Sequence, residues 1–188
     1  EDIDTVVHLG LAPPLGRVAG SKELNVIGSM QLLAACQRTE SLRKLVLGSH
    51  VSVYGSSPRD PALFPESATA RAGTRAGFPK EVVEVEGYVR SFARRRPDVL
   101  VTTLRLSHMV TSNFETALGQ YFSTPVLPFA LGYDPRLQFI HVDDAFEIIA
   151  TAALHDRPGT FNVAGDGVLL LSQAARILGK PLMPLPSI

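Results

Sequence analysis

Residues 79–104 have the sequence PKEVVEVEGYVRSFARRRPDVLVTTL, which predicts an amphipathic helix directly followed by an apolar strand. Proline suits the first helical turn, and the basic run at 94–96 suits the negative end of the helix dipole. The apolar side chains recur at helical spacing and are Val82, Val85, Val89 and Phe92. Residues 99–104 are β-branched and apolar, as in a buried strand.

The same alternation of strand and helix continues on both sides of this stretch. Apolar runs predict strands near residues 5–9, 44–48, 137–141 and 160–163. Helical patterns cover about 21–38, 113–122, 144–154 and 172–178. Nearly continuous apolar strands that alternate with amphipathic helices indicate an α/β fold with a parallel sheet covered on both faces.

Ligands of such sheets lie beyond the carboxyl ends of the strands. We therefore expect residues 8–11, 49–54 and 105–108 to lie at one rim. Residues 55–79 are rich in Gly, Ser, Pro and Ala and form a long loop, which we expect to be mobile until a ligand binds.

Composition excludes several classes of protein. The 188 residues carry 18 basic and 18 acidic side chains, so nucleic acid and anionic membranes are not expected partners. The single cysteine, Cys36, excludes an internal disulfide framework and suits a cytoplasmic protein. The five histidines show no metal-ligand spacing, so no metal is expected.

Both ends of the chain interrupt a pattern. Glu1 stands just before the first strand, and the last residues are rich in proline, so we interpret the sequence as an interior fragment. In a doubly wound sheet further strands would flank residues 5–9. Without them this strand is an open apolar edge, so we expect self-association, as a homodimer or an aggregate.

Seven segments together resemble the extended short-chain dehydrogenases/reductases, in the right order and over nearly the whole chain. They indicate the NAD-dependent epimerase/dehydratase group, and are most similar to UDP-glucose 4-epimerase-like proteins of actinobacteria. The segments are His8-Leu9-Gly10, Asn25-Val-Ile-Gly28, Leu47-Gly-Ser49 with Val53-Tyr-Gly55, Lys80-x-x-x-Glu84, Leu104-Arg105, Gln138-Phe-Ile-His-Val-Asp-Asp144 and Phe161-Asn-Val-Ala-Gly165.

The resemblance implies a Rossmann-like, doubly wound sheet, seen without its first strands, that binds NAD or NADP beside a sugar nucleotide. Residues 1–110 would be the C-terminal part of the dinucleotide-binding domain. Residues 111–188 would partly return to its sheet and partly form an incomplete substrate region. The glycine-rich phosphate loop would precede Glu1, because no G-x-G-x-x-G occurs in this sequence.

The family uses a Ser/Thr–Tyr–Lys set, in which a lysine four residues after the tyrosine lowers the phenol pKa. Here Lys80 matches the lysine, but Ala76 stands at the tyrosine position and His50 at the Ser/Thr position. We assign Lys80 and His50 as candidate catalytic residues, and Tyr54 and His108 as candidate substrate contacts. The implied cofactor contacts are Leu9, Gly10, Leu11, Asn25, Ser49, Lys80 and Leu106.

Two functions remain open on this basis. One is a nucleotide-sugar epimerase or dehydratase in which His50 acts as a substitute base, since imidazole titrates near neutral pH. The other is a non-catalytic protein that binds a dinucleotide or sugar nucleotide as a sensor or assembly partner. Asp143, Asp144 and Glu147 suit the capping of a helix, with Asp144 as the cap, better than an acid/base pair.

Overall fold

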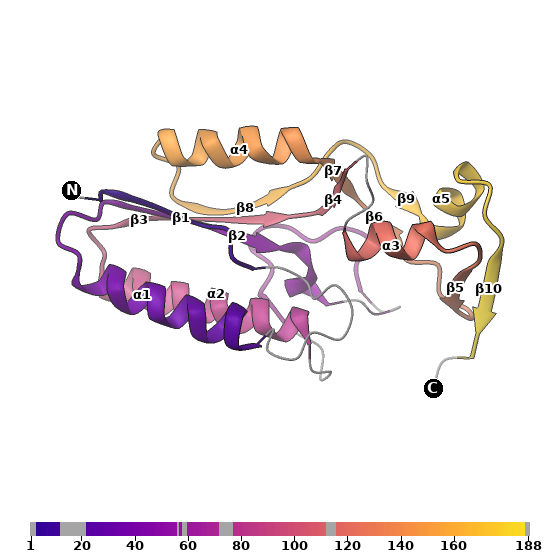
Figure 1. Ribbon diagram of the computed structural model, residues 1–188, viewed down its shortest axis with the longest axis horizontal. Coiled ribbons are helices and arrows are strands. Elements are labelled where there is room, and N and C mark those ends of the chain that lie inside the picture. Colours follow the sequence, from indigo (N-terminus) through magenta and orange to yellow (C-terminus); the bar gives the residue numbers. More distant parts are fainter. Residues whose placement is uncertain are drawn as a thin grey trace.

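The computed structural model describes residues 3–11, 22–55, 57, 60–71, 77–111 and 116–186. Its centre is a parallel sheet of four strands in the order β1-β2-β3-β8. The strands are β1 (Thr5–His8), β2 (Lys44–His50), β3 (Leu100–Leu106) and β8 (Gly159–Val163). Helices α1 (Gly28–Arg38) and α2 (Phe78–Arg95) cover one face, and α4 (Val142–Leu154) covers the other (Figure 1). The predicted Rossmann-like sheet is confirmed.

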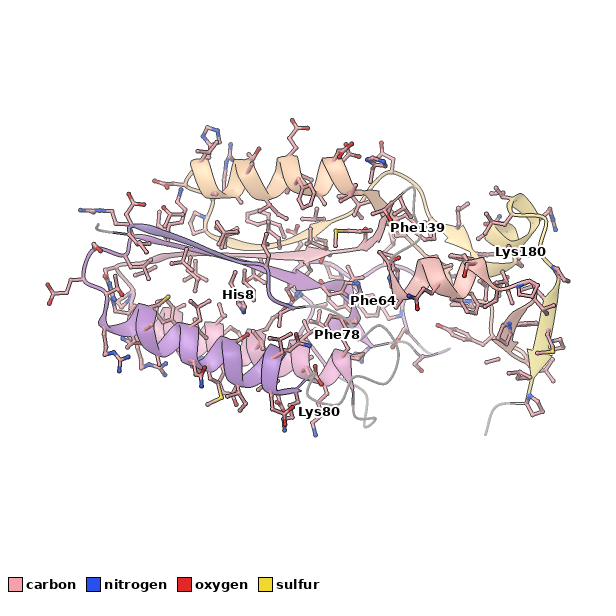
Figure 2. The ribbon with its side chains drawn as sticks, in the orientation of Figure 1. His8, Phe64, Phe78, Lys80, Phe139 and Lys180 are labelled. Atoms are coloured by element: carbon pink, nitrogen blue, oxygen red, sulfur yellow. The ribbon has the colours of Figure 1, made fainter. Side chains whose placement is uncertain are left out.

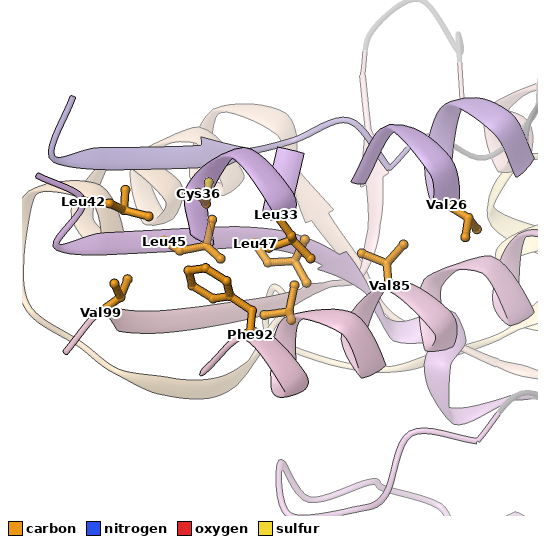
Figure 3. Close-up of a cluster of buried hydrophobic side chains, with 10 residues drawn as sticks. Val26, Leu33, Cys36, Leu42, Leu45, Leu47, Val85, Phe92 and Val99 are labelled. Carbon is orange, nitrogen blue, oxygen red and sulfur yellow. The ribbon is translucent and has the colours of Figure 1, made fainter. Parts of the chain in front are cut away.

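Two apolar cores lie on the two faces of this sheet. On the α1/α2 side, Phe92 of the predicted stripe is fully buried against residues of β2 and α1 (Figure 3). On the α4 side, Val46, Leu104 and Ile149 pack together. Side chains that follow each other along β2 and β3 thus point to opposite cores, which is why these strands are apolar along most of their length.

Two helix starts differ from the sequence prediction. A π-helical turn, η1 (Glu23–Ile27), precedes α1, and residue 21, where the helix was predicted to begin, lies outside the described residues. Helix α4 begins at Val142, and His141 is its N-cap, with Nδ1 accepting from the Asp143 N–H at 3.3 Å. Asp144 as cap is therefore wrong: it lies in the first turn, where its carboxylate compensates the helix dipole.

The remaining elements extend from the strand tips. A short 3-10 turn, η2 (Val51–Tyr54), follows β2 directly, and β4 (His108–Val110) pairs with β7 (Phe139–His141). The strand predicted at 137–141 thus lies outside the main sheet. Beyond it lie α3 (Ala117–Ser123), β5 (Leu127–Ala130), β6 (Arg136–Leu137), β9 (Leu169–Leu170), α5 (Leu171–Ile177) and β10 (Leu182–Leu185). These elements share a core around Phe122 and Leu127.

Residues 60–71 of the long loop are tied to the strand tips. The Arg71 N–H donates to the Val53 carbonyl at 2.7 Å, and the Asn162 amide donates to the Phe64 carbonyl at 2.9 Å. Arg105 donates to the Glu66 and Ala68 carbonyls at 3.4 and 3.2 Å. These bonds count against the predicted mobility for this part of the loop. No helix in the described ranges is long and apolar enough to cross a membrane.

Strand β1 pairs with β2 on one side and has no partner strand on the other within the described residues. We expect residues 1–188, produced alone, to self-associate through this edge, because its backbone groups are free to pair with another chain. Val7→Lys, at a partly exposed position of β1, should shift the population towards monomer in light scattering. Val168→Lys, at a similarly exposed position outside any strand, is the control. A monodisperse monomer of the unmodified chain would contradict this prediction.

Candidate functional site at the strand tips

Parallel pairing of β1, β2 and β3 brings the three predicted rim segments together. His8 pairs with Leu47, and His50 pairs with Leu106. A Cβ at Gly48 would lie 2.9 Å from Leu9 Cδ2 and 3.9 Å from Leu106 Cδ1, so a larger residue there would have to displace the Leu9 side chain. Leu9 remains 49% exposed while Leu106 is buried. The tips therefore form an apolar ledge that is open on the side of Leu9.

His50 is the centre of a ring cluster at the end of β2. Its imidazole lies edge-on to Phe78 at 5.5 Å between centroids and to His108 at 5.2 Å. His108 is in turn 6.5 Å from Phe139 of β7. The two predicted histidines thus meet, one from β2 and one from β4.

Both imidazoles are held neutral. Burial, with a smaller effect of nearby His108, lowers the pKa of His50 to about 4, and burial lowers the pKa of His108. His50 Nδ1 accepts the Ser52 N–H at 3.1 Å and so caps η2. The proton of neutral His50 therefore sits on Nε2, which donates hydrogen bonds rather than accepting a proton. This tautomer does not favour His50 as a general base.

Lys80 lies apart from this cluster. It is exposed on the outer side of α2, whereas Phe78 faces the sheet (Figure 2). The side of α2 towards the tips carries Phe78 and, four residues later, Val82, which is fully buried. The expected placement of Lys80 at the tips is therefore corrected, because residues two apart on a helix do not share a face. Ala76 lies outside the described residues.

Beneath the tips lies a buried polar network that the sequence analysis missed. Arg105 Nε and Nη2 donate to the two oxygens of Glu86 at 3.0 and 2.8 Å, and both side chains are almost fully buried. Ser49 Oγ also donates to Glu86, at 2.7 Å. A glutamate between Val82 and Val89 on the buried stripe was the signal that could have revealed it.

Tyr54 belongs to the same network. Its hydroxyl accepts from Arg105 Nη1 at 2.8 Å and donates to Asn162 Oδ1 at 2.6 Å. Its ring stacks on Phe64 at 4.6 Å. The phenol thus already both donates and accepts within the protein, and the substrate contact of Tyr54 remains a prediction. Ser49 is likewise occupied inside the protein, not at the rim.

Asn25 joins the starts of two helices. It is buried, and its Nδ2 donates to Glu81 Oε2 at 2.8 Å, which links η1 to α2. Nearby, His8 Nε2 and Ser29 Oγ are 2.7 Å apart, and Ser29 Oγ donates to the Asn25 carbonyl. This chain of bonds fixes the end of β1 to α1. Asn25 therefore positions the tips from below, and its predicted cofactor contact remains a prediction.

Residues 1–164 match the model of the NAD dependent epimerase/dehydratase family. The chain belongs to this family. It is 47% identical over 188 residues to uncharacterized proteins of Mycobacterium tuberculosis and Mycobacterium bovis, with 98% of the chain aligned. It spans 50% of the length of these relatives.

Solved structures share the fold at low sequence identity. A dTDP-glucose 4,6-dehydratase of Bacillus anthracis in complex with NAD is 18% identical with a TM-score of 0.73, over 100% of this chain and 61% of that one. A UDP-glucuronic acid 4-epimerase of Bacillus cereus in complex with NAD is 17% identical with a TM-score of 0.72. The match covers 97% of this chain and 63% of that one. A UDP-glucose 4-epimerase of Thermus thermophilus in complex with NAD is 20% identical with a TM-score of 0.68. The match covers 97% of this chain and 65% of that one.

The described residues hold no group of three His, Cys, Asp or Glu side chains that could bind a metal ion.

The ring cluster at the rim and the polar network below it offer different chemistry. The cluster presents neutral rings, and the network holds an ion pair whose polar atoms already have protein partners. Neither contains a phenol next to an ammonium group within the described part of the chain.

The buried ion pair gives a stability prediction. Glu86→Gln should destabilise the protein by about 3–5 kcal/mol, because Arg105 would keep a buried charge without its counter-ion. Arg90→Gln should cost less than about 1 kcal/mol. Arg90 is exposed, and its long contact with the same carboxylate, 3.4 Å from Nη1 to Oε2, is that of a weak surface ion pair. Denaturant unfolding of both variants measures the difference, and equal losses would contradict the role given to Arg105.

The neutral histidines give a pH prediction. His50 is neutral when folded and takes up a proton when unfolded below about pH 6.5, so stability should fall as the pH drops from 6.5 towards 4. The loss from this group reaches about 3 kcal/mol at pH 4. His50→Gln should flatten this dependence, while His155→Gln, exposed at the end of α4, should not. Thermal unfolding between pH 8 and pH 4 checks it, and parallel curves for His50→Gln and the unmodified protein would refute it.

Proposed function

We propose that the protein binds an NAD-type dinucleotide and a sugar nucleotide at the strand tips without the tyrosinate chemistry of its family. The observation that carries the proposal is the face of α2 that meets His50. Phe78 and Val82 occupy it at the spacing at which a phenol and an ammonium would have to stand. A phenyl ring and an isopropyl group exchange no protons.

The other candidate bases are placed unfavourably for proton transfer. The Tyr54 phenol is bonded to Arg105 and Asn162, and His50 uses its acceptor nitrogen to cap η2. Lys80 points away from the sheet. These placements favour a non-catalytic binding protein over an enzyme in which His50 replaces the lost base.

The tips still suit a dinucleotide. Leu9 and Leu106 flank Gly48, and Gly10 leaves room for the His8 ring, whose Cε1 would lie 3.0 Å from a Cβ at that position. We propose that Leu9, Gly10, Leu11 and Leu106 contact the cofactor there. When bound, NAD supplies a hydride acceptor. The chain's own part is to hold its ring against an apolar ledge at the carboxyl ends of the strands.

We expect the full-length protein to bind NAD and UDP-sugars but to show no NAD-dependent turnover of UDP-glucose or UDP-glucuronic acid. Lys80→Ala should leave binding unchanged because Lys80 is exposed on the outer side of α2. Calorimetric titration measures binding, and absorbance at 340 nm together with product analysis measures turnover.

The same assay separates the two functions. Turnover that disappears in His50→Ala but survives in Lys80→Ala would establish an enzyme with a substituted base and overturn the non-catalytic proposal. Binding of NAD without turnover supports it. Absence of binding to NAD, NADP and UDP-sugars would remove the dinucleotide from the proposal altogether.

A further inference from the structure

The main sheet has two outer edges, and they differ in what lies beside them. Strand β1 has no partner on its outer side within the described residues, whereas the outer side of β8 is bonded to the loop of residues 60–71. We call residues 60–71 the strap. An exposed strand edge pairs readily with another chain, and a covering loop is one of the means by which folded proteins prevent this.

The backbone groups of Thr160 and Asn162 face the outer side of β8. Val163 faces β3, because its carbonyl accepts the Ser107 N–H at 2.8 Å. The backbone groups of successive residues in a strand point to alternate sides, so Phe161 also faces β3. Thr160 and Asn162 therefore point away from the sheet, and a further strand would pair with β8 through them.

The strap occupies the outer groups of Asn162. The Asn162 N–H donates to Glu66 Oε1 at 2.9 Å, and its side-chain amide donates to the Phe64 carbonyl at 2.9 Å. A strand that paired with β8 would have to displace the Glu66 carboxylate and the chain that carries it. The strap therefore stands where such a strand would lie.

Other contacts fix the strap in this position. Phe64 lies at the end of the sheet where the strand tips are (Figure 2), and its ring stacks on Tyr54 at 4.6 Å with an angle of 5° between the planes. Arg105 Nη1 donates to strap carbonyls from below. The two ends of the strap are joined by Arg71 Nη2, which donates to Asp60 Oδ1 at 2.8 Å. The strap is thus a compact loop with its ends together, packed by its own side chains.

We propose that the strap guards the outer edge of β8 and prevents a second copy of this chain from pairing with it. A second copy fits the edge because its own β8 presents the same two residues. Two identical edges can pair about a two-fold axis, which closes the contact after two copies. The guard needs no ligand, since all of its contacts lie within the chain.

Removal of the guard should let the chain associate through β8. One variant combines Phe64→Ala with Glu66→Ala, which removes the ring stack and the acceptor of the Asn162 N–H. A second variant replaces residues 61–70 by Gly-Ser-Gly-Ser. Each is compared with its parent by light scattering, both in the unmodified chain and in Val7→Lys, so that the result does not depend on the edge of β1. In Val7→Lys each should have about twice the molar mass of its parent, because one further pair of edges joins.

The matched control combines Leu63→Ala with Ser67→Ala. Both positions are exposed on the strap, so this variant should keep the molar mass of its parent. Thr160→Pro then tests the edge itself. The Thr160 N–H faces away from β3, so proline there removes a donor that a new strand would need and no bond of the existing sheet. Added to either strap variant, it should return the molar mass to that of the parent.

Hydrogen exchange locates the contact. In the strap variants the amides of Thr160 and Asn162 should exchange quickly at low protein concentration and become protected on association. A strap variant that keeps its parent's molar mass while circular dichroism shows it folded would refute the guard. So would association that survives Thr160→Pro or leaves both amides unprotected, because the contact would then lie elsewhere. If neither strap variant folds, the strap is required for folding itself and the proposal fails.

Discussion

The ion pair between Arg105 and Glu86 is the contact on which the arrangement of the strand tips depends. Arg105 comes from β3, an inner strand of the sheet, and Glu86 comes from α2; both side chains are almost fully buried. The same guanidinium reaches Tyr54 in η2, which in turn holds Asn162 of β8. A single planar cation with five donors thus connects a strand, a helix, a turn and a neighbouring strand. An apolar residue could fill the space but could not fix these directions.

The network and the rim above it have different roles. In the network, Glu86, Arg105 and Tyr54 bond to one another, which makes the scaffold rigid and leaves no spare proton donor or acceptor for chemistry. At the rim, His50 and Phe78 form a neutral surface. Within the described residues the parallel sheet of the family is therefore present, while a phenol next to an ammonium group is absent from the described tip. This division supports binding as the function that remains.

The sequence predicted much of this architecture, and its errors have physical causes. Strands β2 and β3 and helix α2 were predicted because their apolar periodicity is strong. His50 and His108 were expected at one rim and do meet there. Lys80 was expected at the tips because it matched a lysine motif. A motif match does not determine the rotation of a helix about its axis. That rotation depends on which residues pack below it, and here the burial of Phe78 and Val82 turns Lys80 outwards.

By itself, the sequence determined the alternation of strands and helices, the parallel sheet and the edge at which a ligand would lie, because these follow from periodicity and chain direction. Only the tertiary structure decided which side chains are free at that edge. The hydrogen bonds of the Tyr54 hydroxyl and the ion pair of Glu86 depend on partners brought from distant parts of the chain, whereas the tautomer of His50 is set by the N–H of Ser52, two residues away. Hydrogen bonding is directional and acts over about 3 Å. No local pattern in the sequence records which partner will stand at that distance.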